Sequence, residues 1–475
     1  MNWVILGIYF ALFIVISVIA YKKTRNTPED FFLAGRSLGP LVYFLSFAAT
    51  NFSAFFFLGF AGASWQFGLG QYGIMGVGTA LVPVSFYFIG RKVWKLGREK
   101  GYLTAPELLA GEFASPLLRI IVFAVMVVFT LPYLFTQALG AGMILSSLAG
   151  ADITKISAVI VILLIGGFVA LTGMRGTAWT DVMQGGIMIV AMITAVVFIS
   201  KGLGGFCQAG LKAFNSSPEH FMRPGPQGFF TPLKWLSFII LWSLVNPLFP
   251  QLFTRFYTAK SIKSLKASAW LYPLLICFLF LAPVLVGVWA RGTKLNFTNP
   301  DMVLPTMVSN YAPSWVHALV MTGALAALIS TAVAQLLALS TMLTNDLGIK
   351  KNKVLIGRIL TMGLCFIVIG FVFAGFGSAG IFTTLVKTTF SGLIALTPST
   401  IAALYFKKIS PLAPILSIIA GEVSVVLIWL KILPVFGLID GIVAFLVSLL
   451  VLVIAAFVFR PKVGLEQSAK QEMSQ

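Results

Sequence analysis

The sequence predicts an all-α integral membrane protein with about thirteen transmembrane helices. Hydrophobic residues make up 59 % of its 475 residues, charged residues make up only 10 %, and the mean hydropathy is +0.99. A soluble domain of this length has too little interior to bury so many apolar side chains, whereas a bilayer covers them from outside. Apolar windows of about 20 residues, the length that crosses a bilayer, recur from one end of the chain to the other.

Each of these windows is expected to be a helix, because lipid offers no partners to backbone polar groups. The first window has no basic leader and is longer than the core of a signal peptide, so we expect it to be a retained span. The expected spans are residues 3–21, 41–66, 70–90, 117–148, 155–173, 178–200, 233–254, 268–290, 312–346, 357–375, 379–405, 411–431 and 437–459.

The placement of the basic residues predicts the topology. With the amino terminus outside, 24 of the 33 Lys and Arg residues fall in inner segments, 8 fall in outer segments, and Lys387 lies within a span. Inner loops of membrane proteins are enriched in Lys and Arg, so we expect the amino terminus outside and the carboxy terminus in the cytoplasm. The net charge of +19 then reports topology and a secondary attraction to anionic lipid, rather than nucleic-acid binding. The compact loops favour the plasma membrane of a prokaryotic cell.

Two of the predicted spans are interrupted. One contains the polar run Ser46–Ala54, and the other contains Asn246-Pro247 and then Pro250. A proline inside a helix leaves carbonyls without amide partners, and lipid cannot satisfy them. Such breaks persist where they line a cavity, and the freed carbonyls suit small hard cations. The alternative is that the prolines only kink packed helices.

The two interrupted spans also occupy corresponding places, each as the first of five helices. Five helices reverse the sense of insertion, so the second set is expected to be inverted relative to the first. Paired interrupted helices in inverted halves point to a solute site near the middle of the membrane, between the two breaks. We therefore expect a five-plus-five inverted-repeat core that carries a small solute.

Four segments make the chain similar to the solute:sodium symporter family, which includes proline, pantothenate, galactose, sialic-acid and monocarboxylate symporters. They occur in order over about residues 30–410. The segments are Phe31–Gly39 (FFLAGRSLG), Gly176–Gln184 (GTAWTDVMQ), Pro250–Lys260 (PQLFTRFYTAK), and Ala326–Thr331 (AALIST) continuing to Thr344–Asp346 (TND).

The resemblance implies the leucine-transporter-type inverted-repeat fold, with one extra helix before the core and two after it. This agrees with the number of spans counted from hydropathy. The expected division of the chain is an extra N-terminal helix and cytoplasmic loop (1–40), a first repeat (41–200), an extracellular loop with a short surface helix (201–232), a second repeat (233–405), two accessory helices (406–459) and a cytoplasmic tail (460–475).

A sodium site is predicted around Ser330 and Thr331. On a helix, their hydroxyls turn back toward the carbonyl of Ala327, three and four residues earlier. Neutral oxygens of this kind suit a hard cation. The resemblance implies that Na⁺ is the coupling ion and that the backbone carbonyls of Ala49 and Phe52 complete the site. The alternative is that these hydroxyls only bond to the backbone of their own helix.

Asp181 is a second candidate. In some members of the family the matching Asp completes a second sodium site with further hydroxyls, but the positions after Thr331 are Ala332, Val333 and Ala334, which offer none. A carboxylate in the first turn of a helix is also favoured by the helix dipole. Asp181 is therefore expected to act either as a gate or ion relay, or in a structural role.

The solute is expected to bind between the two breaks. In sugar-binding relatives, a Glu and a Gln stand where this chain has Phe55 and Phe56. A sugar needs hydrogen-bond partners for each hydroxyl, so these phenylalanines favour a small, partly apolar solute with Asn51 and Gln137 at its polar end. Packing is the alternative role of the Phe run. The candidate contacts are Asn51, Ser53, Phe55, Phe56, Gln137, Trp242, Ser243 and Phe249.

Lys387 is also a candidate, since a charge inside a span costs at least about 2.5–3.5 kcal/mol on insertion scales and usually serves a function. It is expected to be a counter-charge for an anionic solute such as a short monocarboxylate, a partner of Glu422 in the next span, or a side chain that reaches to the membrane surface.

Taken together, the sequence predicts a sodium-coupled symporter that imports a small organic solute by alternating access, with a small monocarboxylate as the first choice. The alternatives are a sodium:amino-acid (proline-like) symporter, a proton-driven carrier that uses Asp181, and a transporter-like membrane sensor, against which the short tail argues. A membrane enzyme is not expected, because the sequence has no metal cluster, nucleophile–base pairing or phosphate loop. The expected partners are the solute, Na⁺ and the lipid bilayer, with no nucleic acid and no obligatory protein partner.

Overall fold

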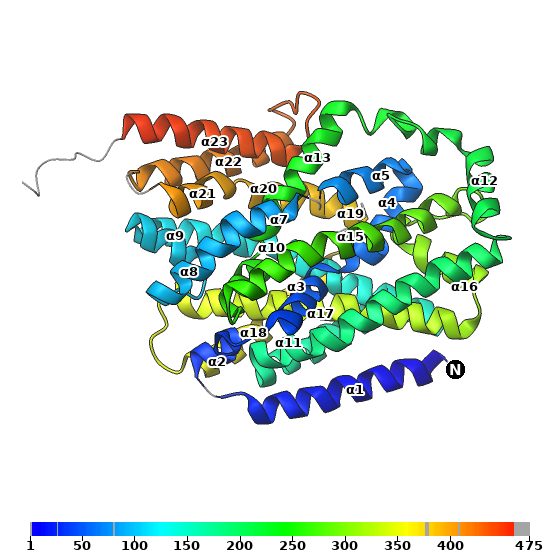
Figure 1. Cartoon of the computed structure of the whole chain (residues 1–475), viewed down its shortest axis with the longest axis horizontal. Helices are drawn as coiled ribbons and strands as arrows, with labels where there is room; N and C mark the ends of the chain where they lie inside the picture. Colours follow the sequence, from blue (N-terminus) through cyan, green and yellow to red (C-terminus); the bar gives the residue numbers. More distant parts are fainter. Residues whose placement is uncertain (1, 26, 79–80, 376–379, 407–408, 460–475) are drawn as a thin grey trace, which may run out of the picture.

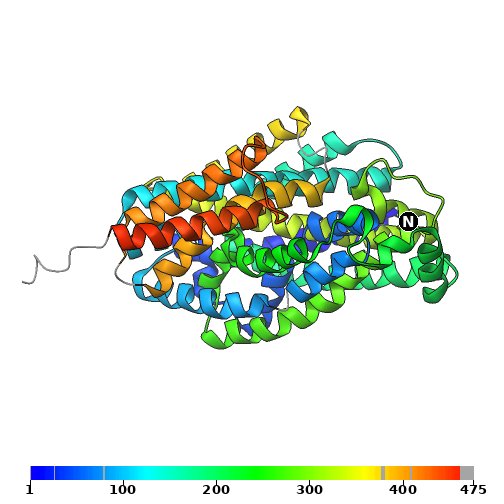
Figure 2. The same cartoon turned by 90° about the horizontal axis from the view of Figure 1, so that it is seen from above.

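A computed structural model describes residues 2–25, 27–78, 81–375, 380–406 and 409–459 of the chain. Within them the chain is built from helices, most of which run along the long axis of the molecule in two views at right angles (Figures 1 and 2). The predicted tail, residues 460–475, lies outside the described residues, as do Lys407 and Lys408.

The helices follow the predicted apolar windows closely. The long helices are α1 (Asn2–Lys23), α10 (Pro116–Ala149), α11 (Thr154–Gly202), α15 (Ile262–Ala290), α17 (Ser314–Asp346), α18 (Lys353–Ala374), α22 (Leu412–Trp429) and α23 (Asp440–Val458). The interrupted spans are α3 (Pro40–Asn51), η2 (Phe55–Gly59) and α4 (Phe60–Phe67), then α13 (Pro232–Val245), η7 (Asn246–Leu248) and α14 (Pro250–Thr258).

Shorter segments make up two further spans and the connections. The first of these spans comprises α5 (Gly70–Tyr72), η3 (Gly73–Val77), α7 (Val82–Ser85), η4 (Phe86–Gly90) and α8 (Arg91–Lys100). The second comprises α19 (Ile381–Leu385), η9 (Val386–Phe390), α20 (Ser391–Ile394) and α21 (Thr397–Tyr405). The connections hold α2 (Pro28–Leu33), η1 (Ala34–Arg36), α9 (Ala105–Phe113), α12 (Phe206–Ser216), η5 (Pro218–Phe221), η6 (Pro226–Gly228), η8 (Pro300–Met302) and α16 (Val303–Tyr311).

Among the described residues, nine helices are long and apolar enough to cross a membrane, or up to eleven if each bent pair counts as one span. The longest, α11, has 49 residues and is interrupted at Gly173, where φ is 57° and ψ is −153°. A straight helix of that length would measure about 74 Å, more than twice the hydrocarbon thickness of a bilayer. This break agrees with the two spans predicted there, and the count of thirteen stays a prediction.

Both predicted interruptions are present and are nearly equal. The two parts of the first interrupted span, Pro40–Asn51 and Phe55–Phe67, meet at 57°, and those of the second, Pro232–Leu248 and Pro250–Thr258, meet at 56°. In each case a phenylalanine at the break is extended, Phe52 at φ −79°, ψ 117° and Phe249 at φ −60°, ψ 126°. The sequence prediction of two broken helices is therefore confirmed.

The helix α17 forms the centre of the bundle. In its most apolar window, 94 % of the residues are buried, and it packs against α10 and α11. Helix α1 lies on one flank, and α22 and α23 lie on the opposite flank (Figure 1). The start of α1 and the end of α23 lie at opposite ends of the bundle (Figure 1), which is the parity expected for an odd number of crossings.

The two ends of the bundle differ in their chemistry. One end holds the last turn of α1 together with α2, α8 and α9 (Figure 1), and carries Lys22, Lys23, Arg36 and the basic residues of α8. We term it the basic end. The opposite end, with α12 and the start of α1, is termed the distal end.

Candidate functional site

The hydroxyl side chains of α17 meet the end of α3. Ser330 Oγ donates to the carbonyl of Ala49 at 2.9 Å and to that of Ala327 at 2.8 Å. Thr331 Oγ1 donates to the carbonyl of Phe52 at 2.8 Å. Both side chains are fully buried. The structure thus brings together all five residues that were predicted to hold sodium.

The oxygens gather here because α3 stops inside the protein. Helix α3 ends at Asn51, and the last four carbonyls of a helix have no amide partner within it. Thr331 Oγ1 also reaches one of these, the carbonyl of Thr50, at 3.0 Å. The carbonyl end of a helix is the negative end of its dipole, and neutral oxygens are the ligands of hard cations. The chemistry of the predicted set, three carbonyls and two hydroxyls, therefore fits Na⁺.

Five aromatic side chains surround the two breaks. We refer to Phe55, Tyr133, Trp242, Phe249 and Phe390 as the aromatic cluster. Ring centroids are 5.4 Å apart for Phe55 and Trp242, 4.9 Å for Trp242 and Phe390, 5.4 Å for Phe249 and Phe390, and 5.7 Å for Tyr133 and Phe249. These are the separations of packed aromatic pairs. Three members were predicted from the sequence, whereas Tyr133 and Phe390 were not.

Polar groups border this cluster on the side of the first break. Ser53 Oγ is 2.9 Å from the hydroxyl oxygen of Tyr133, a member of the aromatic cluster. Gln137 Oε1 accepts the backbone N–H of Ala54 at 2.9 Å, and so supplies a partner at the point where the helix restarts. Asn51 Nδ2 donates to the hydroxyl of Tyr272. Three predicted polar contacts, Asn51, Ser53 and Gln137, therefore lie at the first break.

Two other predicted contacts face elsewhere. Phe56 packs on Phe52 and Phe280, with ring centroids 4.9 and 4.7 Å away. Ser243 Oγ donates to the carbonyl of Gly78 at 3.2 Å and lines a separate groove with Leu244. Successive residues of a helix point about 100° apart, so Phe56 and Ser243 face other neighbours than Phe55 and Trp242 do.

Lys387 also lies apart from the cluster. Its side chain is exposed, whereas Phe390 three residues later is buried. Its carbonyl accepts the indole N–H of Trp429 at 3.2 Å. The carboxylate oxygens of Glu422 are buried and, among the described residues, have no hydrogen-bond partner. Among the described residues, Lys387 therefore forms no ion pair with Glu422 and lies outside the aromatic cluster, and its role stays a prediction.

Asp181 forms a buried ion pair between the two breaks and the basic end. Arg255 Nη2 and Ser46 Oγ both donate to Asp181 Oδ2 at 2.7 Å. Arg255 also donates to Ser46 through Nη1. All three side chains are fully buried. Since Ser46 is in α3, Asp181 in α11 and Arg255 in α14, this triad joins both interrupted spans to a third helix.

Sequence reasoning missed the role of Arg255, because hydropathy placed it just beyond the end of its span and counted it as a loop cation. Its position in the half-helix that begins at Pro250 could have indicated that Arg255 is buried. A cation so close to a helix break has few water molecules around it and needs a buried acid.

Backbone contacts join the same two spans at the basic end. Leu38 N–H donates to the carbonyl of Thr258 at 3.1 Å, and Lys260 N–H donates to the carbonyl of Leu38 at 2.9 Å. The guanidinium of Arg98 donates to the carbonyl of Ala259 at 3.1 Å. These contacts hold the start of α3 beside the end of α14.

The distal end is joined by different chemistry. The rings of Phe67 and Phe229 are stacked, with centroids 3.7 Å apart. Asp301 lies in η8, outside the spanning helices, and accepts the N–H of Ile381 at 2.9 Å. Its burial raises the pKa of this carboxyl from 3.8 to about 6. Side-chain and backbone contacts therefore join the interrupted spans to their neighbours on both sides of the aromatic cluster.

Comparison with known families gives one match over most of the chain. The model of the sodium:solute symporter family matches residues 31–421. Two curated relatives, the sodium/proline symporters of Staphylococcus aureus strains JH9 and JH1, are each 25 % identical over 481 residues, which cover 95 % of this chain and 92 % of theirs.

Two solved structures share the fold. A Na⁺-coupled sialic acid symporter in a substrate-bound outward-open state matches with a TM-score of 0.80 and 17 % identity, over 97 % of this chain and 98 % of that one. Mhp1, a nucleobase-cation-symport-1 family transporter, matches with a TM-score of 0.59 and 12 % identity, over 94 % and 98 %.

Proposed function

The chain belongs to the sodium:solute symporter family, and from this premise we propose that it imports a small monocarboxylate together with Na⁺ by alternating access. Membership of the family makes the chain a sodium-coupled solute transporter of the membrane, not an enzyme. The identity of the solute, the ligands of the ion and the orientation in the membrane are the parts that we add.

The observation that carries the proposal is the contact of Ser330 and Thr331 with the carbonyls at the end of α3. We assign the Na⁺ site to the carbonyls of Ala49, Phe52 and Ala327 and to these two hydroxyls. When the ion binds, the hydroxyl protons turn away and the oxygen lone pairs face it. Sodium then ties α17 to the first interrupted span more strongly than two neutral hydrogen bonds do.

The aromatic cluster supports an apolar carbon skeleton for the solute. Its rings are uncharged and the polar groups beside it, Ser53 and Gln137, are neutral. The half-helices that begin at Phe55 and Pro250 start at the breaks, and the start of a helix is the positive end of its dipole, which favours a carboxylate. A small carboxylate with an apolar tail suits both features.

A proline-like amino acid is the second candidate. Its support is the 25 % identity to sodium/proline symporters over 95 % of the chain. The ring of such a solute also suits an aromatic site, and its ammonium group would lie against ring faces. The two candidates differ in that ammonium group, so one experiment separates them.

The buried triad of Asp181, Arg255 and Ser46 is assigned to the inner gate. With the basic end in the cytoplasm, as the positive-inside rule requires, the triad lies between the aromatic cluster and the cytoplasm. Release of the solute inward requires α3 and α14 to separate there, and this separation breaks the ion pair. Sodium entry supplies about 2.3 kcal/mol per 100 mV of membrane potential, in addition to its concentration gradient.

The test is uptake into proteoliposomes of a bacterial lipid extract. Radiolabelled short monocarboxylates and L-proline are each offered with an inward Na⁺ gradient, an inward K⁺ gradient, or an inward proton gradient, with protein-free liposomes as the control. We expect saturable uptake of a monocarboxylate with the Na⁺ gradient only, increased by a negative interior.

Each other outcome contradicts a stated part of the proposal. Uptake of proline but not of monocarboxylates selects the second candidate. Uptake that a proton gradient alone drives removes Na⁺ as the coupling ion. A Na⁺-dependent rise in melting temperature with a monocarboxylate, but without uptake of any solute, indicates a sensor.

A further inference from the structure

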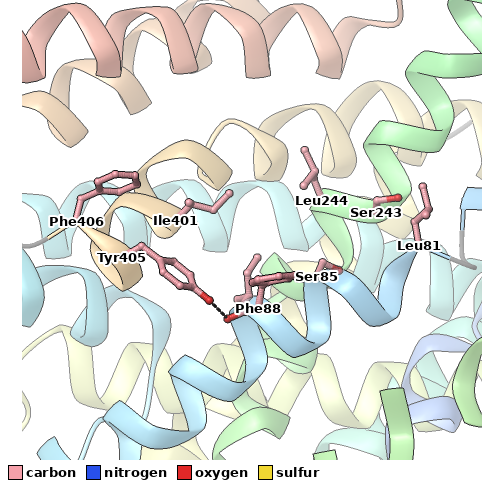
Figure 3. A pocket seen from close by; sticks show the side chains of 9 residues that line it. Leu81, Ser85, Phe88, Ser243, Leu244, Ile401, Tyr405 and Phe406 are labelled. Carbon is pink, nitrogen blue, oxygen red and sulfur yellow. Dashed lines mark hydrogen bonds between the residues drawn. The ribbon is translucent and has the colours of Figure 1, made fainter. Parts of the chain in front are cut away.

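An apolar groove runs along the outside of the bundle between the second interrupted span and two neighbouring spans (Figure 3). Its volume is about 570 Å³. Leu244 of α13 and Ile401 of α21 point into it from one side, and Leu81 and Phe88 border it on the other (Figure 3). The Phe88 side chain is 54 % exposed, so the groove opens toward the surrounding lipid.

A basic pocket of about 350 Å³ continues the groove toward the basic end. Phe88 and Tyr405 line both spaces, and Tyr405 donates to the carbonyl of Phe88 at 2.9 Å. The rest of the pocket is lined by Tyr87 of η4 and by Arg91, Lys92 and Lys95 in the first turns of α8.

Two cations of this pocket, Arg91 and Lys92, contact tyrosine side chains rather than acids. Arg91 donates to the hydroxyl of Tyr87 at 3.1 Å, and the Lys92 ammonium lies 4.9 Å from the centre of the Tyr405 ring. In the part of the chain that the structure describes, neither cation forms an ion pair with an acid. Lys95 has Glu99 at 3.7 Å, and both of those side chains are exposed.

We propose that the groove and the basic pocket together bind one anionic phospholipid, with an acyl chain in the groove and the phosphate between Arg91 and Lys92. The charge of the pocket is complementary to a phosphate, and basic pockets between spanning helices on the cytoplasmic side suit anionic lipid head groups. Tyr405 lies at the boundary of apolar and basic parts, as tyrosines do at the membrane surface.

The continuity of the two spaces selects a lipid over a soluble anion. A soluble phosphate uses only the pocket, whereas a phospholipid also covers the exposed rings of the groove, and each buried methylene group adds to its affinity. The groove borders Leu244 of α13, which precedes the bend of this span at Phe249. A bound acyl chain therefore packs against the half of the second interrupted span that leads to its bend.

The experiment uses the purified full chain in a neutral detergent. Phosphatidylglycerol, phosphatidylcholine with the same acyl chains, and glycerol 3-phosphate are each titrated while the melting temperature and the native mass spectrum are recorded. We expect one retained phosphatidylglycerol and a saturable rise of about 3–5 °C at a hundredfold excess over its dissociation constant. Phosphatidylcholine and glycerol 3-phosphate should give less than a third of this rise.

Three variants locate the site. Arg91→Gln with Lys92→Gln removes the two cations proposed to hold the phosphate, and should abolish the rise. Ile401→Trp fills the groove, and should lower the affinity for phosphatidylglycerol at least tenfold. Lys263→Gln with Lys266→Gln removes two exposed cations of α15 at the same end and should keep the full rise, as a matched control.

Four results overturn the proposal. An equal rise with phosphatidylcholine shows no selection of the head group, and an equal rise with glycerol 3-phosphate shows an anion site without a lipid. An equal loss in the Lys263/Lys266 control shows general attraction to charge. A second copy of the chain in the mass spectrum, lost on filling the groove at Ile401, makes the groove a contact between copies.

Discussion

The two interrupted spans have the same shape but reach it by different means. Their bends are 57° and 56°, and each has an extended phenylalanine at the break. The second break is caused by the sequence of the span itself, because Pro247 and Pro250 cannot donate backbone hydrogen bonds. The first span has no proline after its first residue, Pro40. Its freed groups are instead satisfied by side chains from α17 and α10.

This difference assigns different roles to the two spans. A break that prolines impose is present whether or not a ligand is bound. A break that hydroxyls support changes when an ion takes the place of the hydroxyl protons. We therefore expect the first span to respond to sodium, and the second to serve as a fixed partner that the ion pair of Arg255 and Asp181 joins to it.

The largest effect is expected from removal of one partner of that ion pair. Asp181→Asn leaves the Arg255 guanidinium buried without an acid, which costs about 3–5 kcal/mol. We expect a large fall in melting temperature, and a smaller fall when Arg255→Gln is added, because the double variant has no buried charge. The measurement is a double-mutant cycle by thermal unfolding in detergent.

Glu99→Gln is the matched control for this cycle. Glu99 pairs with Lys95 at the same end, and these two side chains are 54 % and 65 % exposed, so water stabilises the remaining charge and the cost should be under about 1 kcal/mol. If the losses of unfolding free energy for Asp181→Asn and Arg255→Gln add up in the double variant, the two residues are not a coupled pair that joins the two spans.

The second effect concerns the sodium ligands. Ser330→Ala or Thr331→Ala removes one neutral oxygen from the ion, and a hydrogen-bonding group opposite a charge contributes about 1.5–3 kcal/mol. The Na⁺ concentration for half-maximal uptake should therefore rise about 10- to 100-fold. Ser340→Ala is the control, since Ser340 is a buried hydroxyl of the same helix that donates only to Leu337, within α17, among the described contacts. Unchanged sodium dependence in both ligand variants would remove the proposed site.

The fold could be predicted from the sequence because its determinants are local. Hydropathy placed most helix ends within a few residues, as for α10, expected at 117–148 and found at Pro116–Ala149. The proline pair located the second break. The first break was found only because the run Ser46–Ala54 is polar inside an apolar window, and its exact position at Phe52 depends on contacts with α17 that hydropathy does not contain.

Only the parts of the candidate site that depend on local spacing could be predicted from the sequence. Ser330 and Thr331 share a helix turn with Ala327, so spacing alone placed those oxygens together, and the family resemblance supplied Ala49 and Phe52. The aromatic cluster instead depends on how helices are rotated. Phe390 and Tyr133 lie in spans that were not predicted to be interrupted, although Thr389 and Ser391 flank Phe390 and Pro132 precedes Tyr133. The role of Lys387 stays a prediction.

A third prediction compares the two breaks directly by hydrogen–deuterium exchange. At a Na⁺ concentration ten times its dissociation constant, the bound state is favoured by about 1.4 kcal/mol, or about tenfold. Amides of residues 48–56 should slow by up to that factor, and those of residues 244–252 by less than twofold. Thr331→Ala should remove the difference at this Na⁺ concentration, and Ser340→Ala should retain it. Equal protection of both breaks would contradict the assignment of one responsive and one fixed span.

The smallest effect concerns the half of the first interrupted span that is nearer the distal end. Asp301 in η8 accepts a hydrogen bond from the N–H of Ile381, the first residue of α19. The segment η8 packs against α4 and η2. Burial raises the folded-state pKa of Asp301 from 3.8 to about 6, so the folded chain favours the protonated acid. This contribution to stability is complete below pH 3.8 and is lost as the pH rises through 6. Between pH 5 and pH 7 the loss is about 1 kcal/mol, and Asp301→Asn should remove it from the pH dependence of the melting temperature. Wild-type and variant curves that stay parallel would show that Asp301 does not titrate in this range. The contacts of the distal half of the first interrupted span would then be the same at both pH values.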